Sequence, residues 1–245
     1  MQDFNLTSGE PTQVGPVQIT YGARGAGLEY GSDMLTYIYA PRGGFLVAYA
    51  RGVSIPARSI VRLNPGFESK FFPAEDTDLE SIVFRVEDKI PAFTPEQRAT
   101  MEHHGVNPVA LDLEEYHNAI QHHFEDDVLV LPKFFSGGDR VPGWPCNYRK
   151  GQILQLDGAA EWTAVRAAEK AHYHLVTSEI YVGLSGSANM RYNDDALDLT
   201  AGHALLCEPG NIHCVIGITP GSSGIYSHTV AQYPPVQNDK IVVES

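Results

Sequence analysis

Short apolar runs, broken by Gly, Pro and Asp, recur over two parts of the chain, residues 12–90 and residues 150–232. The first part contains the runs MLTYIYA, GFLVAYA and SIVFRV, and the last part contains GQILQL, EIYVGL and HCVIGI. Many short strands with frequent turn residues are typical of an antiparallel sandwich or barrel. The pattern therefore predicts an all-β protein with two β regions.

The stretch between the two β regions has a different pattern, which predicts helices. Thr94 is suited to be an N-cap, and Pro95 fits the first helical position. Gln97 completes a capping box with Thr94, and Gly105 provides a C-terminal stop. A second helix is predicted within residues 111–127, where apolar side chains recur at helical spacing.

The two β regions also resemble each other. Gly43 to Pro65 spans 22 positions and Gly186 to Pro209 spans 23, and each span ends in Pro-Gly. We interpret this similarity as one structural unit used twice. The predicted division has a β domain at each end and a helical connection between them: residues 1–92, 93–149 and 150–245.

Composition narrows the classes of partner. Hydrophobic residues make up 43% of the chain and charged residues 19%, as in a globular soluble protein. The net charge of −13 excludes nucleic acid and anionic membranes as expected partners, because both need clustered basic residues. No apolar run approaches the ~20 residues of a membrane span, and no secretory leader is evident. Three cysteines without CxxC spacing favour reduced thiols and a cytoplasmic location.

Three histidines and a glutamate fall where strands would bring them together. His172 and His174 are two positions apart, so in a strand both side chains point to the same face. Glu179 opens the next apolar run, and a neighbouring strand lies only about 4.8 Å away. Tyr181 would share the face of Glu179, and His213 begins another apolar run. Three imidazoles and one carboxylate suit Fe, Mn, Ni, Co, Cu or Zn.

The spacing of these residues resembles the first motif of the cupin superfamily. That motif is His-x-His, three or four residues, Glu, six residues and Gly, and here Gly186 stands in the last position. The stretch from Gly202 through Gly210 to His213 resembles the second cupin motif. Three departures from the family's pattern affect no ligand: Arg166 for Gly, Pro209 displaced by one position, and Gly217 for Asn.

The resemblance implies a double cupin, with two jelly-roll β-barrels, a short helical connection and a metal inside the C-terminal barrel. It implies one divalent ion per chain, held by His172, His174, Glu179 and His213. The N-terminal repeat has Ser69 at the position of His213, and residues 1–102 contain no histidine. We therefore expect a degenerate N-terminal cupin that is structural or that closes a pocket or a subunit interface.

A cupin with these ligands is expected to be an enzyme that acts on a small molecule. The first hypothesis is a dioxygenase in which Fe(II) binds an enol, diketone or catechol-like substrate, with Mn, Ni or Zn as other possible ions. The second is a metal-dependent isomerase, epimerase or lyase on a sugar or hydroxy acid, and the third is a non-catalytic binding protein. Tyr181 and His228 are the candidate catalytic residues. Exposed β edges lead us to expect a homo-oligomer, most simply a dimer.

Overall fold

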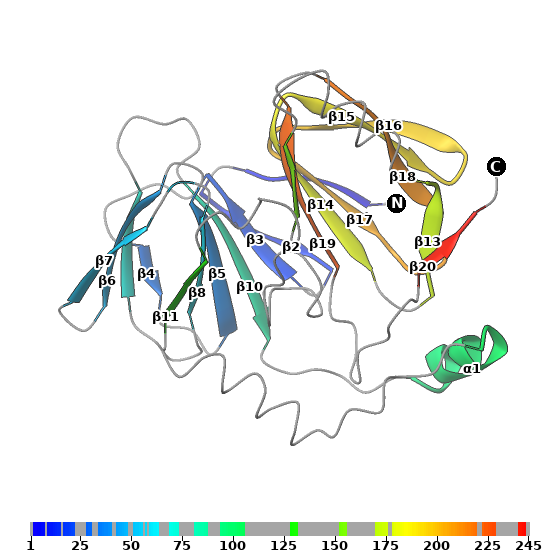
Figure 1. Cartoon of the computed structure of the whole chain (residues 1–245), viewed down its shortest axis with the longest axis horizontal. Helices are drawn as coiled ribbons and strands as arrows, with labels where there is room; N and C mark the ends of the chain where they lie inside the picture. Colours follow the sequence, from blue (N-terminus) through cyan, green and yellow to red (C-terminus); the bar gives the residue numbers. More distant parts are fainter. Residues whose placement is uncertain are drawn as a thin grey trace. The chain divides into compact units, whose positions relative to one another are not determined.

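Antiparallel strands form most of the part of the chain that the structure describes. In the computed structural model the described residues are 2–7, 9–15, 17–22, 28–30, 34–40, 43–48, 51–55, 57, 59–63, 69–73, 81–87, 94–105, 128–131, 152–155, 170–175, 178–219, 222–228 and 240–243. They form antiparallel sheets and one short helix (Figure 1). The predicted all-β fold with two strand-rich parts and a helical connection is therefore confirmed.

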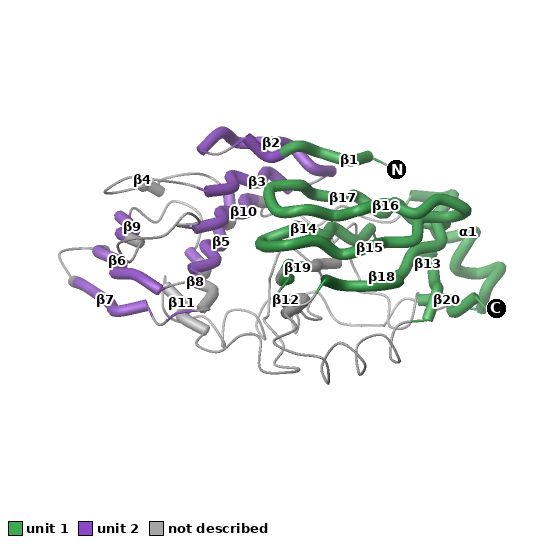
Figure 2. The backbone as a smooth tube through the Cα atoms, turned by 90° about the horizontal axis from the view of Figure 1, so that it is seen from above, with its two compact units in different colours: residues 1–5, 90–111, 153–245 green, residues 6–89, 112–152 purple. Residues whose placement is uncertain are grey.

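The chain divides into two compact units, which Figure 2 shows in different colours. Unit 1 comprises residues 1–5, 90–111 and 153–245, and unit 2 comprises residues 6–89 and 112–152. The predicted domain boundaries, after residues 92 and 149, stay a prediction.

Unit 2 contains two antiparallel sheets. One has the strand order β11-β8-β5-β10-β3-β2, and the other has the order β4-β9-β6-β7. The strands of unit 2 are β2 Pro11–Val14, β3 Val17–Tyr21, β4 Leu28–Tyr30, β5 Met34–Ala40, β6 Gly44–Ala48, β7 Arg51–Ile55, β8 Ser59–Leu63, β9 Ser69–Pro73, β10 Ile82–Glu87 and β11 Val128–Leu131.

Apolar side chains fill the described interior of unit 2. Its core cluster is entirely aliphatic or aromatic: Ile38, Ala40, Leu46, Ile55, Val61, Leu63, Phe71 and Val83. Ser69, the counterpart of His213 in the predicted repeat, is buried on β9. Among the described residues, no group of potential metal ligands gathers in this unit. The role of the N-terminal repeat, structural or closing a pocket or a subunit interface, stays a prediction.

Unit 1 contains two further antiparallel sheets. Their strand orders are β1-β17-β14-β19-β12 and β16-β15-β18-β13-β20. The strands of these sheets are β1 Gln2–Asn5, β12 Gln152–Gln155, β13 His172–His174, β14 Glu179–Ser185, β15 Ser187–Tyr192, β16 Asp195–Thr200, β17 His203–Cys207, β18 His213–Ile218, β19 Ser223–His228 and β20 Lys240–Val242.

The interior of unit 1 follows from the alternation of side chains along its strands. Every second residue of β15 is buried, and these residues are Ala188, Met190 and Tyr192. They pack in one cluster with Tyr181 of β14 and Leu205 of β17. Each large apolar side chain buried in this way stabilises the unit by roughly 1.5–3 kcal/mol. The cluster lies between the two sheets, and the polar residues described below share this interior.

The helix α1, Pro95–His103, has the predicted ends. The Thr94 side chain accepts from the Gln97 backbone, the Gln97 side chain accepts from the Thr94 backbone, and Gly105 has a φ of +63°. Its buried residue, Met101, packs against Leu175 at the end of β13. The second predicted helix, within residues 111–127, lies outside the described residues. No helix in the described part of the chain is long and apolar enough to cross a membrane.

Candidate metal centre

Two histidines come from β13, whose three residues alternate as the sequence predicts. His172 and His174 are buried on one face, and Tyr173 between them is half-buried on the other face, where it packs against the cluster of α1. β13 pairs with β18 through His172 and His213. This pairing brings the third histidine beside the first, with ring centroids 4.5 Å apart.

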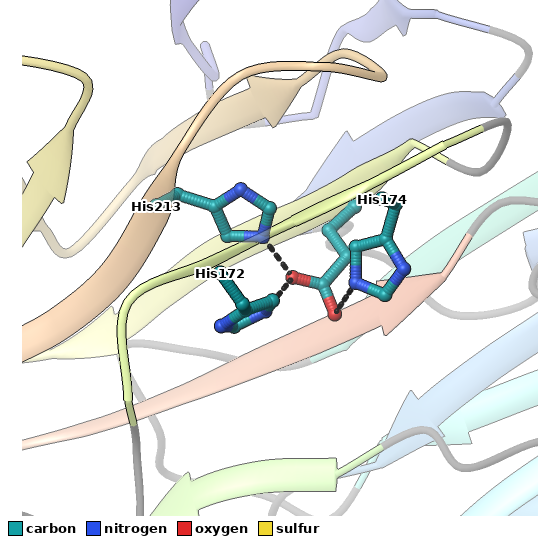
Figure 3. Close-up of side chains that lie close together, drawn as sticks. His172, His174 and His213 are labelled. Atoms are coloured by element: carbon teal, nitrogen blue, oxygen red, sulfur yellow. Dashed lines mark hydrogen bonds and ion pairs between the residues drawn. The ribbon is translucent and has the colours of Figure 1, made fainter. Parts of the chain in front are cut away.

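The carboxylate comes from the other sheet of unit 1. Glu179 opens β14, whose first six residues are all buried. Its side chain lies among the three imidazoles that Figure 3 labels. The four side chains thus converge from both sheets, and each is at most 4% exposed.

The distances in this cluster fit a single ion. The four potential ligand atoms all lie within 4.8 Å of one another. Oε2 of Glu179 is 2.6 Å from Nε2 of His213 and 3.7 Å from Nε2 of His172, and Oε1 is 3.5 Å from Nε2 of His174. An ion about 2.0–2.2 Å from each ligand would separate neighbouring ligand atoms by roughly 3 Å or more. Small side-chain movements are enough to reach that arrangement.

Backbone carbonyls fix the orientation of two imidazoles. Nδ1 of His172 lies 2.8 Å from the Lys170 carbonyl, and Nδ1 of His213 lies 2.9 Å from the Asn211 carbonyl. A carbonyl only accepts, so each Nδ1 donates and carries the hydrogen. In neutral imidazoles this leaves the Nε2 lone pairs directed at the centre of the cluster, as metal ligands require.

The donor set calls for a positive charge at its centre. With Nδ1 of His213 protonated, its neutral ring presents a lone pair to Oε2 of Glu179, also an acceptor, at 2.6 Å. Two acceptors at this distance need a proton or a cation between them. Burial lowers the pKa of His172, although the nearby carboxylate of Glu179 and the hydrogen bond to the Lys170 carbonyl oppose the shift. His172 is therefore neutral at pH 7, and a divalent cation fits the donor set.

A turn that the sequence reading missed supports the third histidine. Asn193 lies in the turn between β15 and β16, with a φ of +54°. Its Oδ1 accepts from the backbone N–H of Ile212, next to His213. Its Nδ2 donates to Oδ1 of Asn211. The backbone N–H of Gly210 donates to the His174 carbonyl, which ties this loop to β13. The signal in the sequence was the Asn-Asp pair between two alternating runs, since both residue types are common in turns.

The motif glycine Gly186 has a local structural reason. It has a φ of +61°, a backbone angle that residues with a side chain rarely adopt. A Cβ at this position would also lie 2.1 Å from Oγ of Ser222. That same Oγ accepts from the backbone of Ser187. Glycine therefore allows the turn from β14 into β15 directly after the strand that carries Glu179.

The structure brings together all four predicted ligands, whose role in binding a metal stays a prediction. It places the hydroxyl of Tyr181, a candidate catalytic residue, 2.7 Å from Oε2 of Glu179. The second candidate, His228, pairs with Glu179 through the backbone of β19, and its side chain is outside the described part of the structure.

No protein-family model and no curated protein matches the chain. Among solved structures, protein Ylba from E. coli is 14% identical, with a TM-score of 0.49 over 86% of this chain and 74% of that chain. A mutant of the oxalate decarboxylase from Bacillus subtilis is 12% identical, with a TM-score of 0.47 over 98% and 79%. A salicylate 1,2-dioxygenase from Pseudaminobacter salicylatoxidans is 14% identical, with a TM-score of 0.41 over 86% and 70%.

These solved structures are cupin-fold proteins, but likenesses this weak indicate neither a substrate nor a reaction for this chain. The stronger observations are its own two-sheet units and the motif residues on β13, β14 and β18. They agree with the resemblance of the sequence to the cupin superfamily.

Proposed function

We propose that this protein is a metal-dependent dioxygenase that acts on a small enol, diketone or catechol-like molecule. The observation that carries the proposal is the convergence of three imidazoles and one carboxylate within 4.8 Å in a buried interior. Fe(II) is the proposed ion, with Mn, Ni or Zn as alternatives, since this ligand set suits all of them. When bound, the ion supplies the Lewis acidity and redox capacity that a reaction with dioxygen needs.

The charges around the site favour a weakly polar substrate. Among the described residues, no lysine or arginine is buried with the four predicted ligands. The neighbouring interior is mostly apolar, with Met190, Leu205 and Val215 in one cluster with Tyr181. Such surroundings are better suited to an unsaturated molecule that binds through two oxygens than to a sugar. The many hydroxyls of a sugar need polar partners.

The hydrogen bond of Tyr181 also supports a dioxygenase over the alternative chemistry. A metal-dependent isomerase, epimerase or lyase needs a side chain that moves a proton to or from its sugar or hydroxy acid. The hydroxyl of Tyr181 donates to Glu179, so its proton is directed at the carboxylate. In a dioxygenase both atoms of dioxygen enter the product, and the protein contributes mainly binding, orientation and exclusion of water.

The test is oxygen consumption by the protein loaded anaerobically with Fe(II), screened against enolisable diketones and catechols. The proposal expects oxygen uptake that requires both Fe(II) and substrate, and that is absent from Zn(II)-loaded protein and from Glu179→Gln. Conversion of sugars or hydroxy acids by Mn-, Ni- or Zn-loaded protein, without oxygen uptake, would establish the isomerase or lyase instead. Ligand binding with no turnover of either kind would establish a binding protein.

A further inference from the structure

Tyr181 and Glu179 form a pair on one strand. They are two positions apart on β14, so both side chains point into the interior of unit 1, where they are 1% and 2% exposed. The hydroxyl of Tyr181 donates to Oε2 of Glu179 at 2.7 Å. A hydrogen bond to an ionised carboxylate in a buried setting is among the stronger ones in proteins.

The surroundings of Tyr181 hold its ring in place. Its backbone pairs with Leu205 of β17 on one side and with Tyr226 of β19 on the other, so it lies within the sheet and not at an edge. Its ring and that of His213 are nearly perpendicular, with centroids 6.1 Å apart and an interplanar angle of 76°. The hydroxyl is therefore presented to Glu179 by a side chain that is fixed by packing on several sides.

The two oxygens of Glu179 consequently have different surroundings. Oε2 accepts from Tyr181 and lies closest to His213, whereas Oε1 is directed at His174. A carboxylate held in this way has one rotational setting, although a free glutamate side chain would sample several. Orientation of a ligand before the ion arrives reduces the conformational entropy that binding would otherwise cost.

We propose that Tyr181 is a positioning residue, which fixes the carboxylate of Glu179 among the three imidazoles and thereby sets the affinity of the site for its divalent ion. This inference rests on the metal site of the proposed function. It assigns Tyr181 a role that acts through Glu179, in place of direct contact with a substrate. Loss of a group that orients a metal ligand typically weakens metal binding by about 10–100-fold.

The test compares Tyr181→Phe with Tyr192→Phe. Tyr192 is the matched control because it is a second buried tyrosine of the same cluster, 5% exposed. Metal-free proteins are titrated with Zn(II) and Co(II) against a chelating competitor, and the visible spectrum of the Co(II) form is recorded. We expect Tyr181→Phe to bind both ions about 10–100-fold more weakly with an altered Co(II) spectrum, and Tyr192→Phe to match the wild type.

A double-mutant cycle shows whether Tyr181 acts through the carboxylate. On a Glu179→Gln background, Tyr181→Phe should weaken Zn(II) binding much less than on the wild-type background, because the two side chains act as a unit. Equal effects on both backgrounds would overturn the inference. So would a crystal structure of the Zn(II)-loaded wild type with the Tyr181 hydroxyl beyond hydrogen-bonding distance of Glu179, a result that needs no variant to fold.

The outcomes separate this inference from the proposed function. If the wild-type protein binds a divalent ion and Tyr181→Phe has the same affinity and the same Co(II) spectrum, only the inference about Tyr181 is overturned. Wild-type protein that binds none of these ions would overturn both.

Discussion

Replacement of Glu179 by glutamine changes the charge of the centre and leaves its shape almost unaltered. The side chain is 2% exposed and lies beside three imidazoles, so it supplies the only negative charge among the predicted ligands. The amide oxygen of glutamine can still accept from Tyr181, so the fold of β14 should persist. We expect Glu179→Gln to remain folded and to lose most of its affinity for divalent metal.

The size of the loss follows from burial. Removal of one charge from a buried pair typically costs about 3–5 kcal/mol, and the ion with its carboxylate is such a pair. At about 1.4 kcal/mol for each factor of ten, the affinity should fall roughly a hundredfold to several-thousandfold. The effect should change little with salt, because a buried pair is poorly screened.

The assay is a competition titration of metal-free protein with Zn(II) and a chelator of known affinity. Glu102→Gln is the control, since Glu102 is an exposed residue of α1 and the substitution changes the net charge equally. The control should bind like the wild type. An affinity of Glu179→Gln within about threefold of the wild type, where the burial argument requires a hundredfold or more, would refute the reasoning.

Three further predictions concern the ligands and the turn that follows β14. His174→Ala should lose its metal on dialysis, whereas His104→Ala, at the exposed end of α1, should retain the ion. Equal loss of metal from both variants would mean that the site is elsewhere. Burial lowers the pKa of His172 in the folded protein below its ordinary 6.5. The neutral form of His172 therefore contributes to the stability of the fold above about pH 6.5, and this contribution is lost as the pH falls through the lowered pKa. Metal release on acidification should therefore occur below pH 6.5, and a midpoint at or above 6.5, measured by dialysis over a pH series, would contradict this. Gly186→Ala and Gly105→Ala share the cost of a positive φ, about 1–2 kcal/mol, but only the new Cβ at position 186 clashes with a neighbour, Ser222. Gly186→Ala should therefore lower the free energy of unfolding, measured in urea, by at least about 1 kcal/mol more than Gly105→Ala. Equal losses in the two variants would refute the clash.

The sequence predicted those features of the site that depend on local periodicity. His172 and His174 face one way because side chains alternate along a strand, and Glu179 and Tyr181 share a face for the same reason. The capping box that begins α1 at Thr94 is also a local pattern, and it was confirmed. Motif spacing then indicated which distant histidine would join the pair.

The features that the sequence could not predict depend on tertiary packing. Which group the Tyr181 hydroxyl would reach depends on the rotamers of two side chains, and the sequence alone left it open between a substrate and a protein partner. The carbonyls that fix the imidazoles belong to loops with no regular pattern. The pairing of β1 with β17 joins residues about 200 positions apart, such as Asn5 and His203, and no local signal marks that register.

The most direct test of the account is the metal content of the wild-type protein, purified without oxygen, incubated with Fe(II), Mn(II) or Zn(II), and freed of loosely bound ions before elemental analysis. The account predicts about one tightly bound divalent ion per chain, and almost none in Glu179→Gln treated in the same way. A folded wild-type protein that retains none of these ions, or a Glu179→Gln variant that retains as much as the wild type, would contradict it.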